Sequence, residues 1–140
     1  MIRSFGEAAF LVEVESPGRA QALASSLRAD PPTGVLEAVP GMESVLVELD
    51  PDGPEPISFI PGLVERLAGV GTDVAVGMLH AIPVVYDGPD LAEVASLTGM
   101  TPADVIDAHS GAELRVLFCG FAPGFAYLGD LSPALRVDRL

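Results

Sequence analysis

The segment FCGFAPGFAYLGD, residues 118–130, is the stretch from which the rest of the chain can be interpreted. It brings four aromatic residues together with three glycines and one proline. Proline and glycine disfavour a regular helix and a central strand, so this composition predicts a loop. The aromatic side chains of such a loop either form a binding surface or fill the interior of a fold.

The spacing within the segment is compatible with both interpretations. Phe125 and Tyr127 are two residues apart, and Phe121 lies four residues before Phe125, so an extended backbone would place the three rings on one side. Pro123 would stiffen the turn, and Gly124 would allow the backbone to approach a ligand closely. These residues could therefore line a pocket or contact a partner, and the residues alone leave core filling equally open.

The composition of the 140-residue chain predicts a folded protein. Hydrophobic residues make up 49% of it and the mean hydropathy is +0.45, which is enough for a hydrophobic core. The sequence contains no apolar run of the ~18 residues that a membrane span needs. The N-terminal segment has acidic residues within its apolar part, unlike a signal peptide. A cytoplasmic protein is the expectation from these features.

The charge balance argues against nucleic acid and against an anionic membrane surface as partners. The formal net charge is −13, and all seven basic residues are arginine. Binding to phosphate groups requires clustered basic residues, which this chain lacks.

The single cysteine, Cys119, excludes a disulfide framework, and we expect it to be a small buried side chain. Two histidines and scattered acids predict no metal site, and no glycine-lysine phosphate loop is present.

The first half of the chain predicts an α+β domain over residues 1–78. Alternating apolar residues predict a strand in 8–16, and two further strands in 35–41 and 43–50. Helical periodicity predicts helices after Ser16 and in 57–71. The order β-α-β-β-α is typical of a small ferredoxin-like unit with both helices on one face of a mostly antiparallel sheet. The residues expected on the buried helical faces are Ala20, Leu23, Ala24 and Leu27, and then Ile60, Leu63, Val64 and Leu67.

The second half predicts a different domain, over residues 79–140. A β-branched and aromatic run predicts a strand at 82–86, and 112–120 alternates like another strand. Between them, 90–99 and 100–110 have the periodicity of two short helices.

Capping signals mark the ends of both short helices. Asp90 is expected to cap the first helix, which Gly99 would end. Thr101 is expected to be the N-cap of the second, with Pro102 at its first position and Asp104 in its first turn.

Two long segments resemble one protein family. They are IPVVYDGPDLAEVASLTGMTPADVIDAHS (82–110) and GFAPGFAYLGDL (120–131). Both are similar to the family of the 5-oxoprolinase B subunit, which is also described as allophanate hydrolase subunit 1 or the carboxyltransferase C/D-type domain. That family includes the KipI-type kinase inhibitors. The resemblance implies that residues 79–140 are the first part of a cyclophilin-like β-barrel. It also implies further barrel strands beyond residue 140 in family members, and therefore a chain truncated relative to them.

The same resemblance implies a site but no catalytic residues. His109 matches a family position just before a strand, although a histidine is also favourable at a helix C-terminus for electrostatic reasons alone. The residues expected to bind substrate are His109, Phe121, Pro123, Gly124, Phe125 and Tyr127.

The function implied is that of one component of an ATP-dependent 5-oxoprolinase, an amide-ring hydrolase that converts 5-oxo-L-proline to L-glutamate. ATP would be used by the complex, and the partners would be proteins like the A and C subunits of 5-oxoprolinase. Two alternatives remain open within the family: a KipI-like inhibitor of a sensor histidine kinase, and a component of the allophanate hydrolase or urea carboxyltransferase type.

Overall fold

The computed structural model of this chain describes residues 1–71 and 77–138, which form two compact units. The first unit comprises Met1–Val76 and Leu117–Tyr127, and the second comprises Gly77–Val116 and Leu128–Leu140. The fold is α+β, as the sequence predicts. The domain boundary between residues 78 and 79 stays a prediction.

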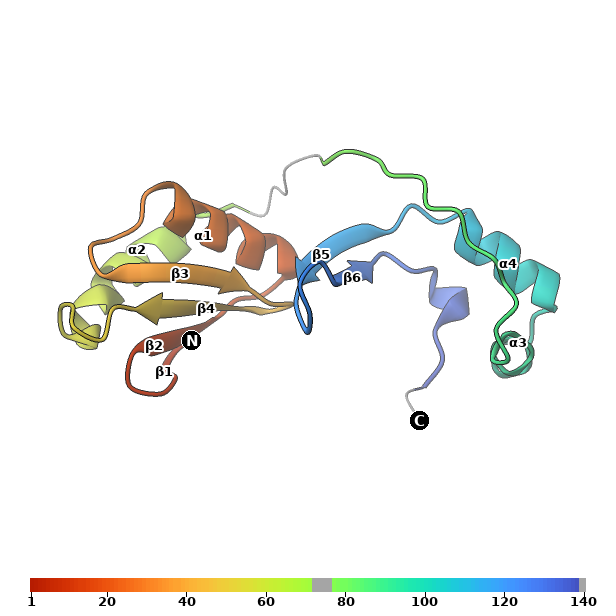
Figure 1. The fold of residues 1–140 in the computed structure, drawn as a ribbon, viewed down its shortest axis with the longest axis horizontal. Helices are drawn as coiled ribbons and strands as arrows, with labels where there is room; N and C mark the ends of the chain where they lie inside the picture. Colours follow the sequence, from red (N-terminus) through yellow and green to blue (C-terminus); the bar gives the residue numbers. More distant parts are fainter. Residues whose placement is uncertain (72–76, 139–140) are drawn as a thin grey trace. The chain divides into compact units, whose positions relative to one another are not determined.

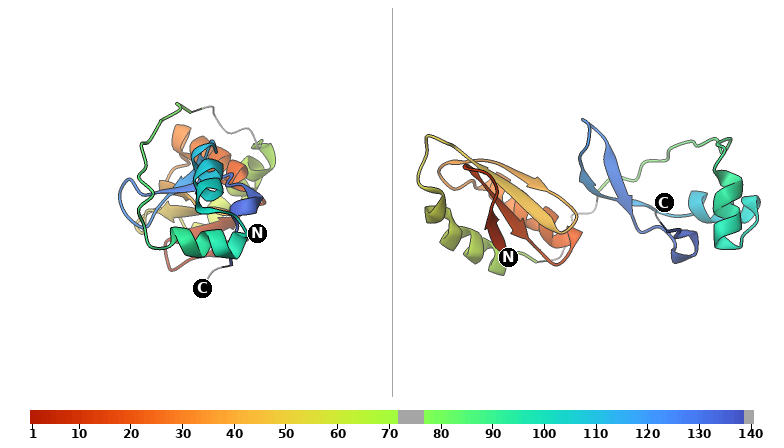
Figure 2. Two further views of the ribbon diagram at one scale, coloured as in Figure 1. Left: turned by 90° about the vertical axis from the view of Figure 1, so that its right-hand side faces the viewer. Right: turned by 90° about the horizontal axis from the view of Figure 1, so that it is seen from below.

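The first unit is built on a four-stranded antiparallel sheet with the strand order β1-β2-β4-β3 (Figure 1). Helices α1 and α2 cover one face of it, and α1 packs directly on β3 and β4 (Figure 2). The elements are β1 (Ile2–Ser4), β2 (Ala9–Glu13), α1 (Pro17–Ala29), β3 (Val35–Pro40), β4 (Ser44–Leu49), the 3-10 helix η1 (Pro56–Phe59) and α2 (Ile60–Gly69).

Strand alternation places one set of apolar side chains under the helices. In the register of β2 and β4, Phe10 lies opposite Val47. Two residues along, Val12 lies opposite Val45. All four are buried, because residues two apart on a strand share a face. The core that they form also contains Ala20, Leu23, Ala24, Leu27, Ala38, Leu49, Phe59 and Leu63.

The predicted order of elements is confirmed in this unit, with two differences. Strand β1 was not predicted, because three residues are too few for a periodic signal; it is held by pairing, with Ile2 opposite Val12. The assignment of Val64 to the buried face of α2 is wrong, since Val64 is 52% exposed while its neighbour Leu63 is 1% exposed. Adjacent helical residues point about 100° apart, and a short helix lying on a sheet buries a narrow stripe.

The second unit has a small core between two short helices. These are α3 (Leu91–Thr98) and α4 (Pro102–Ser110), which pack on each other and on the 3-10 helix η2 (Pro133–Leu135). Ala95, Val105 and Leu135 are its buried side chains. Both helices are confirmed, and so is the end of α3 at Gly99, which has the left-handed φ of 69° that glycine tolerates.

Two local predictions for this unit are wrong. Residues 82–86 form no strand, because β-branched residues favour a strand only where a neighbouring strand is available to pair with, and none of the described strands pairs there. Asp90 precedes α3, but its side chain accepts no capping hydrogen bond within the described residues. Its backbone is already helical, with φ −82° and ψ −9°, which is not the extended conformation of a capping residue.

The glycine- and aromatic-rich segment 118–130 is part of a hairpin. Strands β5 (Arg115–Cys119) and β6 (Ala126–Gly129) make a two-stranded sheet, and residues 120–125 connect them. The β5 strand is confirmed, while β6 lies where the glycines and the proline predicted a loop. Cys119 is exposed, so its predicted burial is wrong: within residues 1–71 and 77–138, no second layer covers this side chain. The described strands close no barrel.

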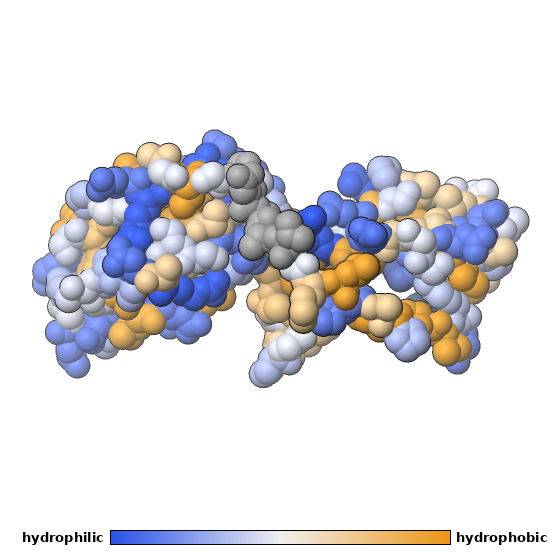
Figure 3. Space-filling model, turned by 90° about the horizontal axis from the view of Figure 1, so that it is seen from above, coloured by the Kyte–Doolittle hydropathy of each residue, from blue (hydrophilic) through white to orange (hydrophobic). Residues whose placement is uncertain are grey.

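Apolar side chains remain at the surface of both units. Figure 3 shows orange patches on the face that it draws. Large exposed apolar side chains among the described residues include Leu36, Ile57 and Leu97. None of the described helices is both long enough and apolar enough to cross a bilayer.

The contrast within α2 gives a direct test of the fold. Leu63→Ala should lower the free energy of unfolding of the first unit by about 2–5 kcal/mol, because it leaves a cavity in the core. Val64→Ala is the matched control and should change it by less than about 0.5 kcal/mol, because an exposed site loses few contacts. Urea denaturation followed by circular dichroism measures both. Equal losses in the two variants would contradict the orientation of the helix.

Candidate functional site

The hairpin carries a continuous row of aromatic contacts. Phe118 and Tyr127 stack with ring centroids 4.5 Å apart and planes at 14°. Phe125 then packs edge-on against Tyr127 at 5.3 Å, and Phe121 against Phe125 at 5.8 Å. Edge-to-face and offset-stacked pairs at these separations are the favourable arrangements for aromatic rings. These contacts between rings therefore stabilise the arrangement of the four side chains in the absence of an enclosing core among the described residues.

The aromatic rings are exposed as well as clustered. Phe121 is 92% exposed, Phe125 49% and Tyr127 38%. Core filling, the competing interpretation, is therefore not met within the part of the chain that the structure describes. Exposed aromatic clusters are typical of surfaces that bind a partner or a ligand.

The backbone at the tip of the hairpin is held in an unusual conformation. Gly124 has a φ of 76°, which glycine adopts freely, but Phe121 has a φ of 65°, which a residue with a β-carbon rarely adopts. Backbone hydrogen bonds fix the loop: the Gly120 N–H donates to the carbonyl of Phe125 at 3.0 Å, and the Phe125 N–H donates to that of Ala122 at 3.0 Å. A bulky exposed residue kept at a positive φ points to a role for its side chain.

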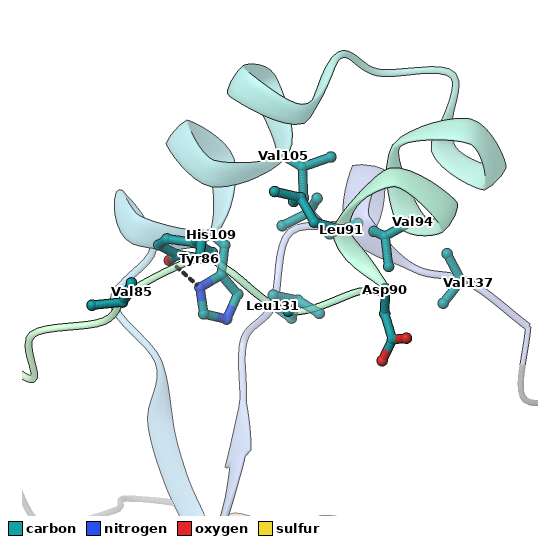
Figure 4. Close-up of a pocket in the computed structure, with 11 residues that line it drawn as sticks. Val85, Tyr86, Asp90, Leu91, Val94, Val105, His109, Leu131 and Val137 are labelled. Atoms are coloured by element: carbon teal, nitrogen blue, oxygen red, sulfur yellow. Dashed lines mark hydrogen bonds between the residues drawn. The ribbon is translucent and has the colours of Figure 1, made fainter.

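The second unit contains a pocket of ≈ 410 Å³ (Figure 4). The residues that line it come from the irregular segment before α3, from both helices, and from the chain around η2. They are Val85, Tyr86, Gly88, Asp90, Leu91, Val94, Val105, His109, Leu131, Leu135 and Val137. Most are aliphatic, and three carry polar groups.

A hydrogen bond between Tyr86 and His109 forms the polar part of this pocket. The Tyr86 hydroxyl lies 2.8 Å from Nδ1 of His109, and the rings meet edge-on with centroids 5.7 Å apart (Figure 4). Both side chains are half-buried. The bond ties the irregular segment before α3 to the last turn of α4, so it sets the orientation of the imidazole.

Helix α4 is positioned by a capping box that the sequence largely predicts. The Asp104 N–H donates to the Thr101 hydroxyl oxygen at 3.2 Å, and the Thr101 N–H donates to Oδ2 of Asp104 at 3.1 Å. The Thr101 hydroxyl also donates to Oδ2 at 2.6 Å. These hydrogen bonds, first from the hydroxyl and then from the backbone, hold the pKa of the Asp104 carboxyl below its usual range. The cap fixes where α4 begins, and the helix length then places His109 in its last turn.

The six residues predicted to bind substrate fall in two places. Phe121, Pro123, Gly124, Phe125 and Tyr127 lie in the hairpin, whereas His109 lies in the pocket of the second unit. The side chains that surround His109 were not predicted from the sequence. Tyr86 and Asp90 line the same pocket. The sequence predicted a strand for the run that contains Tyr86, and it predicted a helix cap for Asp90, so neither residue was expected in a site.

The described side chains do not fit a metal ion, and the described lining of the pocket does not fit ATP phosphates. Among residues 1–71 and 77–138, no three His, Cys, Asp or Glu side chains are placed to share a metal ion. The described lining of the pocket includes no arginine and does include the Asp90 carboxylate, which would repel a polyphosphate.

Comparison with known proteins gives consistent matches. The sequence model named "Carboxyltransferase domain, subdomain C and D" matches residues 1–140. The 5-oxoprolinase B subunit of Bacillus subtilis (strain 168) is 35% identical over 153 residues, which covers 99% of this chain and 62% of that protein. The 5-oxoprolinase B subunit of Escherichia coli O157:H7 is 37% identical over 147 residues, covering 96% and 65% respectively. The chain thus spans slightly less than two thirds of these relatives.

A solved structure is similar as well. The crystal structure of TTHA0988 superposes with a TM-score of 0.74 and 35% sequence identity. The superposition covers 94% of this chain and 26% of that one.

The capping box predicts a pH-dependent contribution to stability. The pKa of Asp104 is lower in the folded state than in the unfolded state. Its ionised form therefore stabilises the fold fully at pH values above the pKa that Asp104 has in the unfolded chain. That contribution is lost as the pH falls through the folded-state pKa. Asp104→Asn should therefore lower the melting temperature at neutral pH, and the difference from wild type should shrink in acid. Thermal melts over a pH series measure this.

The matched control for that experiment is Asp107→Asn, which makes the same charge change on the same helix but outside the capping box. If the difference in melting temperature between Asp104→Asn and wild type stays constant from neutral pH into acid, the account is contradicted.

Proposed function

Because this chain belongs to the family "Carboxyltransferase domain, subdomain C and D", we propose that it acts as one component of an ATP-dependent 5-oxoprolinase. In this proposal the complex opens the ring of 5-oxo-L-proline to give L-glutamate, and it works in the cytoplasm. The observation that carries the proposal is the identity of 35% and 37% to two proteins named as the B subunit of 5-oxoprolinase, over nearly all of this chain.

The designation of these relatives as one lettered component of an enzyme supports a complex of several chains. We propose proteins like the A and C subunits of 5-oxoprolinase as the partners, with ATP used by the assembly. A site shared between chains accounts for the few polar groups that the pocket of this chain contains.

The hairpin is the proposed contact with those partners. Its aromatic row is exposed, and none of the other described strands pairs with this two-stranded sheet, so its outer edges can accept a further strand. Aromatic residues are enriched among the side chains that carry most of the energy of a protein interface. In the same proposal, residues 1–78 are a ferredoxin-like domain and residues 79–140 are the first part of a cyclophilin-like barrel, to which β5 and β6 contribute strands.

Two other functions are supported by particular observations. A KipI-like inhibitor of a sensor histidine kinase would use the same exposed aromatic hairpin as its protein-binding surface. The name of the matched family suggests a carboxyltransferase, which supports a role in an allophanate hydrolase or urea carboxyltransferase only through the resemblance of the sequence. The identities to two 5-oxoprolinase relatives favour the 5-oxoprolinase proposal over both.

Reconstitution tests the proposal. We expect 5-oxoproline-dependent ATP hydrolysis when this chain is mixed with purified proteins of the A and C types. The rate should fall to background when this chain is left out. If a full-length B subunit restores activity in the same mixture and this chain does not, the proposed function is wrong for this polypeptide.

Replacement of Phe121 separates partner binding from stability. Phe121→Gly removes an exposed ring and relieves a positive φ, so the free energy of unfolding should stay within about 1 kcal/mol of wild type. Its affinity for the partner proteins should nevertheless fall about tenfold or more, as for aromatic interface residues generally. Calorimetric titration and urea denaturation measure the two quantities.

Ala122→Gly is the control for added loop flexibility, because it introduces a glycine at the next position and removes no ring. It should bind the partner proteins as wild type does. Unchanged affinity in Phe121→Gly, or an equal loss in both variants, would contradict the proposed role of the Phe121 side chain.

A further inference from the structure

The pocket of the second unit has apolar walls suited to a compact ring. Its volume of ≈ 410 Å³ is within the range of small-molecule sites in proteins. Leu91, Val94 and Leu131 line it from different elements, and Figure 4 shows them around one hollow. Such walls would contact the methylene groups of a ring and exclude water from around it.

The Tyr86–His109 pair can donate a hydrogen bond to a ligand in either of its hydrogen-bonded states. If the Tyr86 hydroxyl donates to Nδ1, the neutral imidazole carries its proton on Nε2. If the Nδ1–H donates to the Tyr86 oxygen instead, the hydroxyl keeps a proton to give. Figure 4 shows the second ring nitrogen of His109 turned away from Tyr86. A ligand carbonyl oxygen can therefore be bound at this pair in both states.

Asp90 decides which charge the pocket accepts. Among the described lining residues it carries the carboxylate, and Figure 4 shows that carboxylate on the same open side as the imidazole. An anion beside it is repelled, and the net charge of −13 adds to that repulsion. An N–H group is attracted instead, because a carboxylate accepts hydrogen bonds.

We infer that this pocket binds the ring of a lactam, an uncharged cyclic amide. The carbonyl oxygen faces the Tyr86–His109 pair, the N–H faces Asp90, and the ring carbons contact the aliphatic walls. This inference rests on the proposed function, whose substrate contains such a ring, and assigns the ring to this chain. In this inference the carboxylate that 5-oxoproline carries beside its ring lies outside the pocket, because Asp90 would repel it.

Binding of simple rings to the full 140-residue chain tests the inference. The probe is 2-pyrrolidone, followed by the shifts of the pocket methyl groups in NMR spectra. A ligand with so few atoms should bind weakly, with a dissociation constant in the millimolar range. Cyclopentanone keeps the ring and the carbonyl but lacks the N–H, and it should bind about three- to tenfold more weakly.

Two variants and one control locate the binding groups. Tyr86→Phe should weaken 2-pyrrolidone binding by about three- to tenfold, because it removes the hydroxyl that either donates to the ligand itself or keeps the imidazole proton on Nε2. Asp90→Asn removes the negative charge at an exposed position, so it tests the pocket even if Tyr86→Phe fails to fold. It should shift the relative affinity toward the 5-oxoproline anion and away from 2-pyrrolidone. His80→Gln alters an exposed residue outside the lining and should bind both ligands as wild type does.

The outcomes separate this inference from the proposed function. If 2-pyrrolidone shifts none of the pocket methyl groups, the inference is wrong, even where the reconstituted complex hydrolyses 5-oxoproline. If cyclopentanone binds as tightly as 2-pyrrolidone and Asp90→Asn changes nothing, lactam recognition is wrong. If 2-pyrrolidone binds as expected and the complex is inactive on 5-oxoproline, the lactam site stands and the proposed function is wrong.

Discussion

The packing of α4 on α3 and η2 is the contact on which the candidate pocket depends. It rests on three buried side chains, Ala95, Val105 and Leu135, and on a capping box that fixes where α4 begins. The irregular segment before α3 has no strand partner among the described residues, so the Tyr86–His109 hydrogen bond is what ties it to this core. The pocket is therefore shaped by a small number of contacts, each of which can be altered separately.

The two units differ in how much apolar surface they bury. Among the residues that the structure describes, the core of the first unit has twelve buried side chains, from the sheet, α1, α2 and η1, whereas that of the second has three. Burial of apolar side chains is the main source of stability, so the second unit has the smaller reserve. Clefts and exposed aromatic rings are tolerated where other elements supply the stability, and a small unit bound to partner proteins can obtain it from the interface.

Local signals account for the parts of the fold that the sequence predicted. Helix α4 has a threonine cap, a proline at its first position and an acid in its first turn, all within a few residues, so its start could be located. Gly99 marked the end of α3 in the same way.

The wrong predictions concerned features that depend on contacts with residues distant in the sequence. The 82–86 run had the composition of a strand but lacked a strand to pair with, and the expected burial of Cys119 required a covering layer. Strand β6 escaped detection because pairing with β5 overrides its glycine-rich context. The site was anticipated only in part, since the resemblance pointed to His109 and the hairpin, whereas the Tyr86 contact is formed by residues far apart in sequence.

We propose that the aromatic hairpin of this chain contacts partner proteins and that its pocket binds a ligand. Hydrogen–deuterium exchange of this chain, alone and mixed with proteins like the A and C subunits of 5-oxoprolinase, tests that claim most directly. The account predicts that amides of residues 115–129 and of the segment around Tyr86 exchange more slowly in the mixture, while those on the outer strand β1 are unchanged. Exchange that is the same with and without the partners would contradict it.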